Sequence, residues 1–302
     1  MVIAVTGASG FIGAELLEVL NRREDVYVIA LTRDAYSFDS YERCEWRNTD
    51  YSFDSLVKAL EDADAVIHLA GVRGTENEPE KFYVNSKMTE NILKAMAENE
   101  VKRIVFASSV AVYNGITEMP WKEEDPKGNY RAYGDSKLEC ENLIIKHSNE
   151  QDFSYGIARI AQVLGEGERR RGMMNVFIDT AREHGQLKVM GKSQAVKQYI
   201  YVKDLVNVLQ MMTAEYSNGS SSLLERNMIL NVGMPNAYTN LEIAQIVNEV
   251  FGNHTPIDYD DSYTETGRAF YMDTSKLQRE LGCEVMDMRE ALTDMNNNHK
   301  TQ

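Results

Sequence analysis

The stretch MVIAVTGASGFIG, residues 1–13, places three glycines between an apolar run and an amphipathic segment, Ala14–Leu20. The run predicts a β-strand and the segment predicts a helix. Gly7 permits a tight turn, Gly10 lets the backbone approach a phosphate, and Gly13 lets the helix lie close to the strand. Because a helix N-terminus attracts anions, the stretch predicts a cradle for the pyrophosphate of a dinucleotide. Glycines alone also fit an ordinary tight connection, but their place directly after an N-terminal strand favours the cradle.

Short apolar runs alternate with helical patterns through the first half of the chain, as in successive βαβ units. The predicted strands are Val26–Leu31, one containing Cys44–Arg47, Ala65–Ala70, Arg103–Ala107 and Tyr155–Ile160. The predicted helices are Phe53–Leu60, Asn85–Ala97 and Ala132–His147. This order predicts an α/β fold with a parallel sheet and a smaller second lobe.

The predicted domains are discontinuous, because the alternation decays after about Gly165 and no low-complexity linker follows. The later predicted elements are a helix at Val176–His184, the segment Gln198–Val208, a strand at Met228–Val232 and a helix at Leu241–Phe251. We expect residues 1–164 and 198–234 to form the dinucleotide-binding domain. We expect residues 165–197 and 235–302 to form the smaller second lobe.

The chain has 302 residues and a formal net charge of −15. This charge argues against nucleic acid or an anionic membrane as the main partner. The first strand begins at Val2 and no apolar run approaches membrane-spanning length, so we expect a cytoplasmic protein. Cys44, Cys140 and Cys283 match neither a disulfide framework nor a zinc spacing, and no metal site is predicted.

The segment YGDSK holds Tyr133 and Lys137 four residues apart on a predicted helix, so both side chains lie on one face. A phenol acts as a base at neutral pH only when its ionised form is stabilised. An ammonium about 4 Å away contributes about 4 kcal/mol at an effective dielectric of about 20, which is the size required. Taken alone, the pair also fits a solvated helix face.

Ser108 and Ser109 follow the predicted strand Arg103–Ala107 and favour a catalytic interpretation of the YGDSK segment. In an open parallel sheet, ligands lie beyond the carboxyl ends of the strands, which places this serine pair at the mouth of a site. A hydroxyl there can hold a substrate oxygen while Tyr133 takes its proton. For Ser108, a helix cap is the alternative role.

Six motifs follow one another along nearly the whole chain. They are TGASGFIG, HLAG at His68–Gly71, Asn85, SSVAVY at Ser108–Tyr113, YGDSK, and YIYVKD at Tyr199–Asp204. With them the chain resembles the extended short-chain dehydrogenase/reductase family, the nucleotide-sugar epimerases and dehydratases. The resemblance implies a Rossmann-type doubly wound parallel sheet with a smaller C-terminal substrate lobe. It also implies NAD or NADP as cofactor, a nucleoside-diphosphate sugar as substrate, and Ser109, Tyr133 and Lys137 as catalytic residues. By analogy, it also implies a homodimer paired through the helices of the Asn85 and Tyr133 regions.

The cradle and the resemblance together imply a set of cofactor-binding residues. Asp50 matches the position that approaches the adenine, while Leu69–Gly71 and Ala107 match strand ends that run alongside the cofactor. The full predicted set is Gly7, Ser9, Gly10, Phe11, Ile12, Gly13, Thr32, Arg33, Asp50, Tyr51, Leu69, Ala70, Gly71, Arg73, Asn85, Ala107, Tyr133, Lys137 and Ile160.

Thr32 and Arg33 stand where an acid would hold the ribose hydroxyls of NAD. A guanidinium suits the 2′-phosphate of NADP better, because its fork donates two charge-assisted hydrogen bonds. The sequence therefore favours NADP slightly over NAD. Arg33 as a plain surface cation, or Asp34 turned toward the ribose, are the alternatives.

The substrate lobe departs from the family pattern. Gln162 stands where the family often has an asparagine that touches the substrate phosphate, and Lys197 stands where an arginine is usual. Lysine keeps the charge but loses the bidentate fork. The predicted substrate-binding residues are Ser109, Gln162, Met174, Lys197 and Arg268. The run Arg169–Arg171 is a further candidate, and core packing is the alternative for the methionines.

Val110 and Ala111 follow Ser109, where dehydratase relatives carry an acid pair, so dehydration is disfavoured. The favoured activity is that of a nucleotide-sugar 4-epimerase. An NADPH-dependent reductase of a nucleotide-linked 4-keto sugar is the alternative. A non-catalytic dinucleotide-sensing protein is a third possibility, which the complete set of serine, tyrosine and lysine disfavours.

Overall fold

The computed structural model describes residues 1–33, 41–113, 115–125, 131–168, 172–213, 227–262 and 269–299. The chain divides into two compact units. Unit 1 comprises Met1–Thr117, Glu123–Ile160 and Val206–Leu230, and unit 2 comprises Glu118–Lys122, Ala161–Leu205 and Asn231–Gln302. The predicted domain boundaries place residues 118–122, 161–164, 198–205 and 231–234 with the dinucleotide-binding domain, whereas in the structure they belong to unit 2. Residues 198–201 do so because they pair with other strands of that unit.

Unit 1 is built on a seven-stranded sheet in the order β10-β6-β5-β4-β1-β2-β3. Its strands are β1 Val2–Thr6, β2 Tyr27–Thr32, β3 Cys44–Asn48, β4 Ala65–His68, β5 Arg103–Ser109, β6 Ser154–Ile160 and β10 Met228–Val232. Parallel pairing runs continuously from β3 through β1 to β6. The strand order reverses beside β1, which is the doubly wound topology and confirms the predicted fold class. Ligands of such sheets bind beyond the carboxyl ends of the strands at this reversal.

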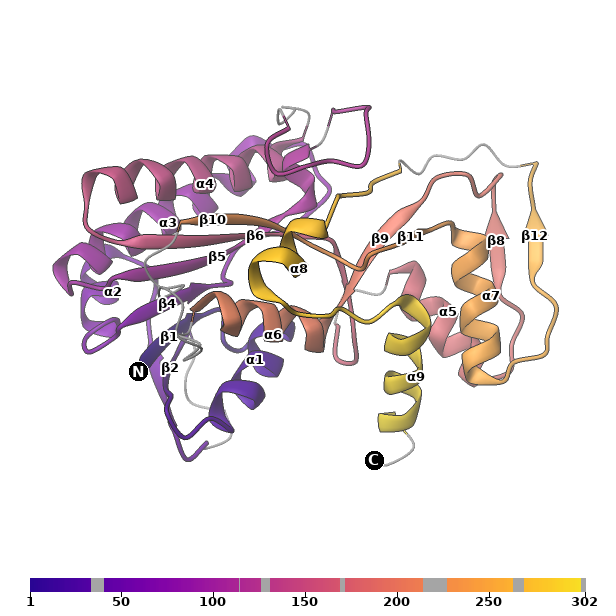
Figure 1. Cartoon of the computed structure of the whole chain (residues 1–302), viewed down its shortest axis with the longest axis horizontal. Coiled ribbons are helices and arrows are strands. Elements are labelled where there is room, and N and C mark those ends of the chain that lie inside the picture. The colour runs from indigo at the N-terminus through magenta and orange to yellow at the C-terminus, as the bar shows by residue number, and fades with distance from the viewer. Residues whose placement is uncertain are drawn as a thin grey trace. The chain divides into compact units, whose positions relative to one another are not determined.

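Helices cover both faces of this sheet (Figure 1). They are α1 Phe11–Asn21, α2 Phe53–Ala59, α3 Pro79–Glu98, α4 Ala132–Glu150 and α6 Val202–Thr213, with a 3₁₀ turn, η1, at Val110–Tyr113. Helices α3 and α4 pack together on one face, and α1 and α6 lie on the other. Because both faces are covered, strands such as β1 and β4 are buried along nearly their whole length instead of alternating between buried and exposed residues.

Several boundaries in unit 1 differ from the sequence prediction by a few residues, and two of them bear on the site. Helix α3 begins at Pro79 rather than at Asn85, since proline is favoured at the first position of a helix, where its missing N–H costs nothing. Strand β5 extends through Ser109, so Ser108 and Ser109 are its last two residues instead of the start of a loop. Their side chains therefore point to opposite faces of the sheet, as those of successive strand residues do.

Unit 2 holds a three-stranded sheet, ordered β11-β9-β7, and a two-stranded sheet of β12 and β8. Its strands are β7 Gln162–Leu164, β8 Lys188–Met190, β9 Lys197–Tyr201, β11 Ala237–Tyr238 and β12 Asp258–Asp260. Its helices are α5 Met173–Arg182, α7 Asn240–Phe251, α8 Ser275–Leu281 and α9 Met288–His299. Helix α7 packs against α5 and α9. Among the described residues of both units, no helix combines the length and apolar composition needed to cross a bilayer.

Candidate active site

The predicted glycine loop connects β1 to α1. Gly7 has a φ of 68°, and a Cβ on it would lie 2.9 Å from the backbone nitrogen of Ala70. A Cβ on Gly13 would lie 2.3 Å from the carbonyl oxygen of Gly7, so neither position has room for a side chain. Gly10 is the N-cap of α1 and provides no side-chain cap. The first N–H groups of α1 are therefore available to an anion.

Thr6 joins the ends of β1 and β4, the two strands beside the reversal. Its Oγ1 accepts hydrogen bonds from the N–H groups of Leu69 and Ala70, each at 3.1 Å, and lies 2.8 Å from Nδ1 of His68. Because those two donors occupy its lone pairs, the Thr6 hydroxyl donates to His68, whose Nε2 then donates to Thr89 Oγ1 at 3.1 Å. Burial, with the nearby Lys137 charge, lowers the pKa of His68 to about 3 and keeps the ring neutral.

Asn85 forms two hydrogen bonds with the backbone of the loop that follows β4. Its Oδ1 accepts the N–H of Val72 at 2.7 Å, and its Nδ2 donates to the Val72 carbonyl oxygen at 2.9 Å. A Cβ built on Gly71 would lie 3.4 Å from Asn85 Oδ1 and 3.6 Å from Lys137 Nζ. Three residues of the predicted cofactor set, Gly71, Asn85 and Lys137, thus lie together.

Lys137 on α4 is buried and its ammonium is held at the carboxyl end of β5. Its Nζ donates to the carbonyl oxygen of Ala107 at 2.8 Å and lies 4.6 Å from the centre of the Phe106 ring. Tyr133 lies one turn earlier, in the first turn of the same helix, and its half-buried ring lies 5.8 Å from that of Phe82. No described residue forms a hydrogen bond with its hydroxyl, which leaves the phenol free to meet a ligand.

Ser109 ends β5 on the same edge of the sheet. Its Oγ accepts the N–H of Ala111 at 3.2 Å, so its own proton stays free to be donated. Val110 and Ala111, which open η1, bring no carboxylate to this edge.

A buried ion-pair network lies directly behind this edge, and Glu141 and Arg159, which form it, were not among the predicted site residues. Glu141 Oε1 accepts the Ser108 hydroxyl at 2.5 Å, and Arg159 donates to both oxygens of Glu141, at 3.1 and 2.8 Å. Arg159 also donates to the Tyr113 hydroxyl at 2.7 Å. Ser108 is therefore a member of this network and not a helix cap. Glu141 follows Lys137 by one helix turn, and this spacing was the available signal.

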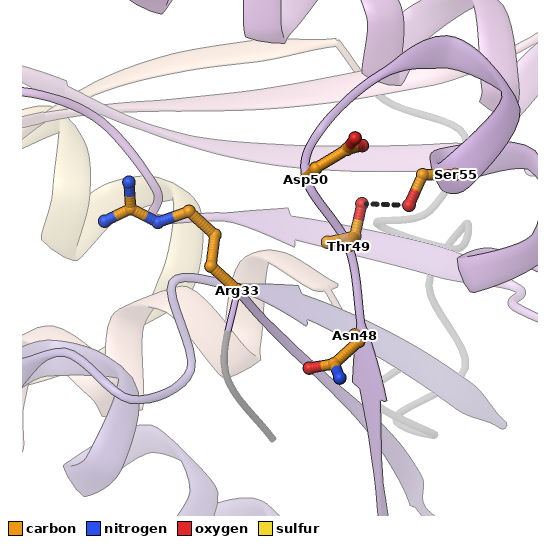
Figure 2. Close-up of a pocket in the computed structure, with 5 residues that line it drawn as sticks. All are labelled: Arg33, Asn48, Thr49, Asp50 and Ser55. Carbon is orange, nitrogen blue, oxygen red and sulfur yellow. Dashed lines mark hydrogen bonds between the residues drawn. The ribbon is translucent and has the colours of Figure 1, made fainter. Parts of the chain in front are cut away.

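An open pocket of about 390 Å³ lies at the carboxyl ends of β2 and β3 (Figure 2). It is lined by Arg33, Asn48, Thr49, Asp50 and Ser55. The side chains of Arg33 and Asp50 extend from the two adjacent strand ends, while Ser55 donates to Thr49 Oγ1 at 3.1 Å. No described residue forms a hydrogen bond or ion pair with the exposed Arg33 guanidinium. The pocket thus presents one cation and one anion to solvent.

The glycine loop also contacts the ends of β2 and β3. The Tyr51 hydroxyl accepts the N–H of Gly7 at 3.2 Å, and Ser9 Oγ lies 3.2 Å from Thr32 Oγ1. The rest of the predicted cofactor set is placed around these contacts: Phe11 and Ile12 open α1, Arg73 is exposed in the loop after β4, and Ile160 ends β6.

The predicted substrate residues other than Ser109 fall in unit 2 or outside the described residues. Gln162 begins β7 and is exposed. Met174 on α5 is only 7% exposed, which favours the packing alternative. Lys197 Nζ donates to Asn240 Oδ1 at 2.9 Å. Outside the described residues lie Arg268, the run Arg169–Arg171 and Asp34.

The three cysteines form no disulfide: Cys140 and Cys283 are buried and Cys44 is half-buried. Burial raises the pKa of the Cys44 thiol to about 11, so it stays protonated at neutral pH. Within the described part of the chain, no three side chains of His, Cys, Asp or Glu are grouped so that they could hold a metal ion.

The glycine loop, the HLAG loop and the YGDSK helix thus meet on one edge of one sheet, as the resemblance implies. The model of the NAD dependent epimerase/dehydratase family matches residues 3–233. The chain belongs to this family. Membership confirms the resemblance drawn from the sequence motifs.

Relatives within the family cover nearly the whole chain. The UDP-glucose 4-epimerase of Bacillus subtilis (strain 168) is 27% identical, over 94% of this chain and 92% of that protein. The putative UDP-glucose 4-epimerase of Methanocaldococcus jannaschii is 26% identical, over 99% of this chain and all of that protein. The crystal structure of UDP-N-acetylglucosamine 4-epimerase from Bacillus cereus is similar with a TM-score of 0.85 and 28% identity, over 100% of this chain and 97% of that one.

Proposed function

We propose that this chain is an NAD(P)-dependent 4-epimerase of a nucleoside-diphosphate sugar. Its full-length similarity to proteins named as UDP-sugar 4-epimerases supports the reaction. The single observation that carries the proposal is the end of β5: Lys137 is bonded to the Ala107 carbonyl, Tyr133 stands one turn earlier with a free phenol, and Ser109 ends the strand.

The residues beside the strand reversal fit a dinucleotide. Side chains at Gly7 and Gly13 would collide with backbone, and the uncapped start of α1 offers N–H groups to a diphosphate. Asn85 and Lys137 would hold the nicotinamide ribose. When bound, the dinucleotide supplies reversible hydride transfer at its nicotinamide ring.

Three residues of this chain would handle the proton and the oxygen of the sugar. Tyr133 takes the proton of the C4 hydroxyl and returns it after the sugar has presented its other face. Ser109 holds the same oxygen with its free hydroxyl proton. The Lys137 ammonium, one turn from Tyr133, stabilises the phenolate. Because Val110 and Ala111 provide no acid, this set does not eliminate water.

The test is to incubate the purified protein with UDP-, GDP- and dTDP-sugars while following isomer composition and NADPH absorbance. Interconversion of two C4 isomers without net redox change supports the proposal. Stoichiometric loss of NADPH with a 4-keto sugar would establish the reductase in its place. Binding without turnover of any sugar would establish a sensor.

For the cofactor, we propose NADP ahead of NAD. Thr32 ends β2 where an acid would favour NAD, and the Arg33 guanidinium stands exposed at the pocket of Figure 2. Hydrogen bonds to a charged group contribute about 1.5–3 kcal/mol, so Arg33→Ala should weaken NADP binding at least about tenfold. NAD serves as the internal control, because it lacks the 2′-phosphate. Calorimetric titrations giving equal losses for both dinucleotides would contradict this preference.

For the assembly, we propose a homodimer paired through α3 and α4. Adjacent apolar residues on α3, Tyr83 and Val84, are 66% and 42% exposed in the single chain, which supports a partner at this face. Sedimentation should give a dimer for the native chain and a monomer for Val84→Glu. A native monomer would contradict the pairing. The cytoplasmic location stays a prediction.

A further inference from the structure

Two adjacent residues of β5 are bonded to two residues of α4 that lie one helix turn apart. The Ala107 carbonyl accepts from Lys137 Nζ at 2.8 Å, and the Ser108 hydroxyl donates to Glu141 at 2.5 Å. We name this pair of contacts the β5–α4 ladder. All four residues are buried, so water does not compete for these bonds. The ladder fixes how far α4 can slide or rotate against the end of β5.

Arg159 on β6 immobilises the Glu141 carboxylate, which accepts the Ser108 hydrogen bond of the ladder. The Arg159 and Glu141 side chains are each 1% exposed. The guanidinium donates to both Glu141 oxygens and also to the Tyr113 hydroxyl and the Glu123 carbonyl. A guanidinium held by this many hydrogen bonds has a single orientation, and it therefore fixes the orientation of the Glu141 carboxylate as well.

A buried ion pair is a poor choice for stability alone, because well-packed apolar residues of similar volume are often as stable or more so. Its directional bonds can, however, specify position. Ser109 follows Ser108 on β5, and Tyr133 precedes Lys137 by one turn on α4. The ladder therefore connects the two elements that carry the proposed substrate-facing hydroxyls.

We propose that Ser108, Glu141 and Arg159 are positioning residues that set the distance between the Ser109 and Tyr133 hydroxyls. This inference rests on the proposed function, in which both hydroxyls meet one sugar oxygen. A misplacement of about 1 Å at a reacting centre can cost on the order of a hundredfold in rate. The network therefore acts on turnover, while substrate and dinucleotide are held by other residues.

Ser108 offers the mildest test, because its replacement leaves the ion pair intact. Ser108→Ala should lower kcat at least about tenfold, with KM for the sugar and Kd for the dinucleotide within about twofold. Ser108→Thr, which keeps a hydroxyl and suits a strand, should stay within about threefold of the native kcat. Ser154→Ala is the matched control: Ser154 is 8% exposed, donates to the Lys102 carbonyl, and begins β6 at the far edge of the sheet. Its kcat should be native.

A purely structural hydroxyl predicts a different pattern, in which Ser108→Ala lowers the melting temperature and leaves kcat within about twofold of the native value at permissive temperature. That result would overturn the inference, as would an equal loss in Ser108→Thr. Hydrogen exchange separates this inference from the proposed function. Amides 133–137 should exchange faster in Ser108→Ala than in Ser154→Ala, whether or not the native chain turns over a sugar. Unchanged exchange would also overturn it.

Discussion

The two ends of the unit 1 site are built in opposite ways. At the glycine loop, the decisive feature is the lack of side chains: Gly7 and Gly13 admit none, and backbone N–H groups face outward. At the end of β5, the decisive features are long, charged side chains buried away from water, such as Glu141 and Arg159. The backbone determines the shape of the glycine loop, whereas hydrogen bonds and ion pairs between side chains fix the end of β5.

The difference matches the two tasks proposed for the site. A diphosphate can be bound by many N–H groups at once, so the shape of the loop matters more than any one group. Proton transfer depends on one hydroxyl at hydrogen-bond distance from one oxygen, which calls for rigid support. The comparison predicts that substitutions at the β5 end cost more than substitutions at the loop.

The largest stability effect is expected for Glu141→Gln. Removing one partner leaves Arg159 charged and buried without compensation, which should lower the free energy of unfolding by about 3–5 kcal/mol. Asp152→Asn is the control, since its pair with Lys102 at 3.2 Å has side chains 100% and 62% exposed. That exposed pair should lose less than about 1 kcal/mol. Urea denaturation measures both, and similar losses would remove the distinction between buried and exposed pairs.

Tyr133→Phe isolates the proposed chemistry from the supporting structure. Loss of a general base should lower kcat on the order of a thousandfold, equivalent to about 4 kcal/mol of barrier. Dinucleotide affinity and stability should stay close to native, because the hydroxyl has no partner among the described residues. Tyr27→Phe, at a 43% exposed position on β2, is the control and should keep native turnover. Near-native kcat in Tyr133→Phe would show that the base is assigned wrongly.

A smaller effect is expected at the loop for Gly13→Ala. The added Cβ would lie 2.3 Å from backbone oxygen, so α1 must shift away from β1, at about 1–3 kcal/mol of stability. Dinucleotide affinity should fall with it, as seen by titration calorimetry. Gly172→Ala, where a Cβ meets nothing within 4 Å, should cost less than about 1 kcal/mol and leave affinity unchanged. Equal behaviour of the two variants would contradict the close packing described for the loop.

The effect that is smallest at neutral pH is the contribution of His68 to the dependence of stability on pH. Its pKa falls from an ordinary 6.5 to about 3 on folding, so below pH 6.5 the unfolded chain binds a proton that the native chain does not. Stability should therefore decline as the pH falls, by about 1.4 kcal/mol per pH unit between about pH 6 and pH 4 from this residue. Denaturation at several pH values should show a shallower slope for His68→Gln than for the native chain. Parallel slopes would show that His68 is not buried as a neutral ring.

The sequence predicted best what is local in the chain. The glycine spacing, the apolar runs and the four-residue separation of Tyr133 and Lys137 depend on neighbours, so β1, α1 and α4 were found where predicted, with ends that differ by up to three residues. Strand β5 ends two residues later than predicted, since serine after an apolar run is as common in a loop as in a strand. Membership of the epimerase family follows from the order of the same local motifs.

The sequence could not reveal contacts between residues far apart. Glu141 and Arg159 are 18 residues apart, and nothing in either segment indicates that β6 and α4 bring them together. The Thr6–His68 hydrogen bond joins residues that lie 62 positions apart in the chain, and it could not be predicted from the sequence either. The burial of the Met174 side chain depends on how α5 packs, so the residues next to it in sequence could not predict it. Such contacts follow from topology, which only the fold supplies.

If this chain is a 4-epimerase, one site removes and returns both the C4 hydride and the proton of the C4 hydroxyl. UDP-glucose and UDP-N-acetylglucosamine carrying deuterium at C4 test this, with NMR of the sugar after incubation. We expect one of the sugars to become its C4 isomer with the deuterium retained at C4 and no net change in NADPH absorbance. An isomer that has exchanged this deuterium for hydrogen from water, or the absence of any C4 isomer, would contradict it.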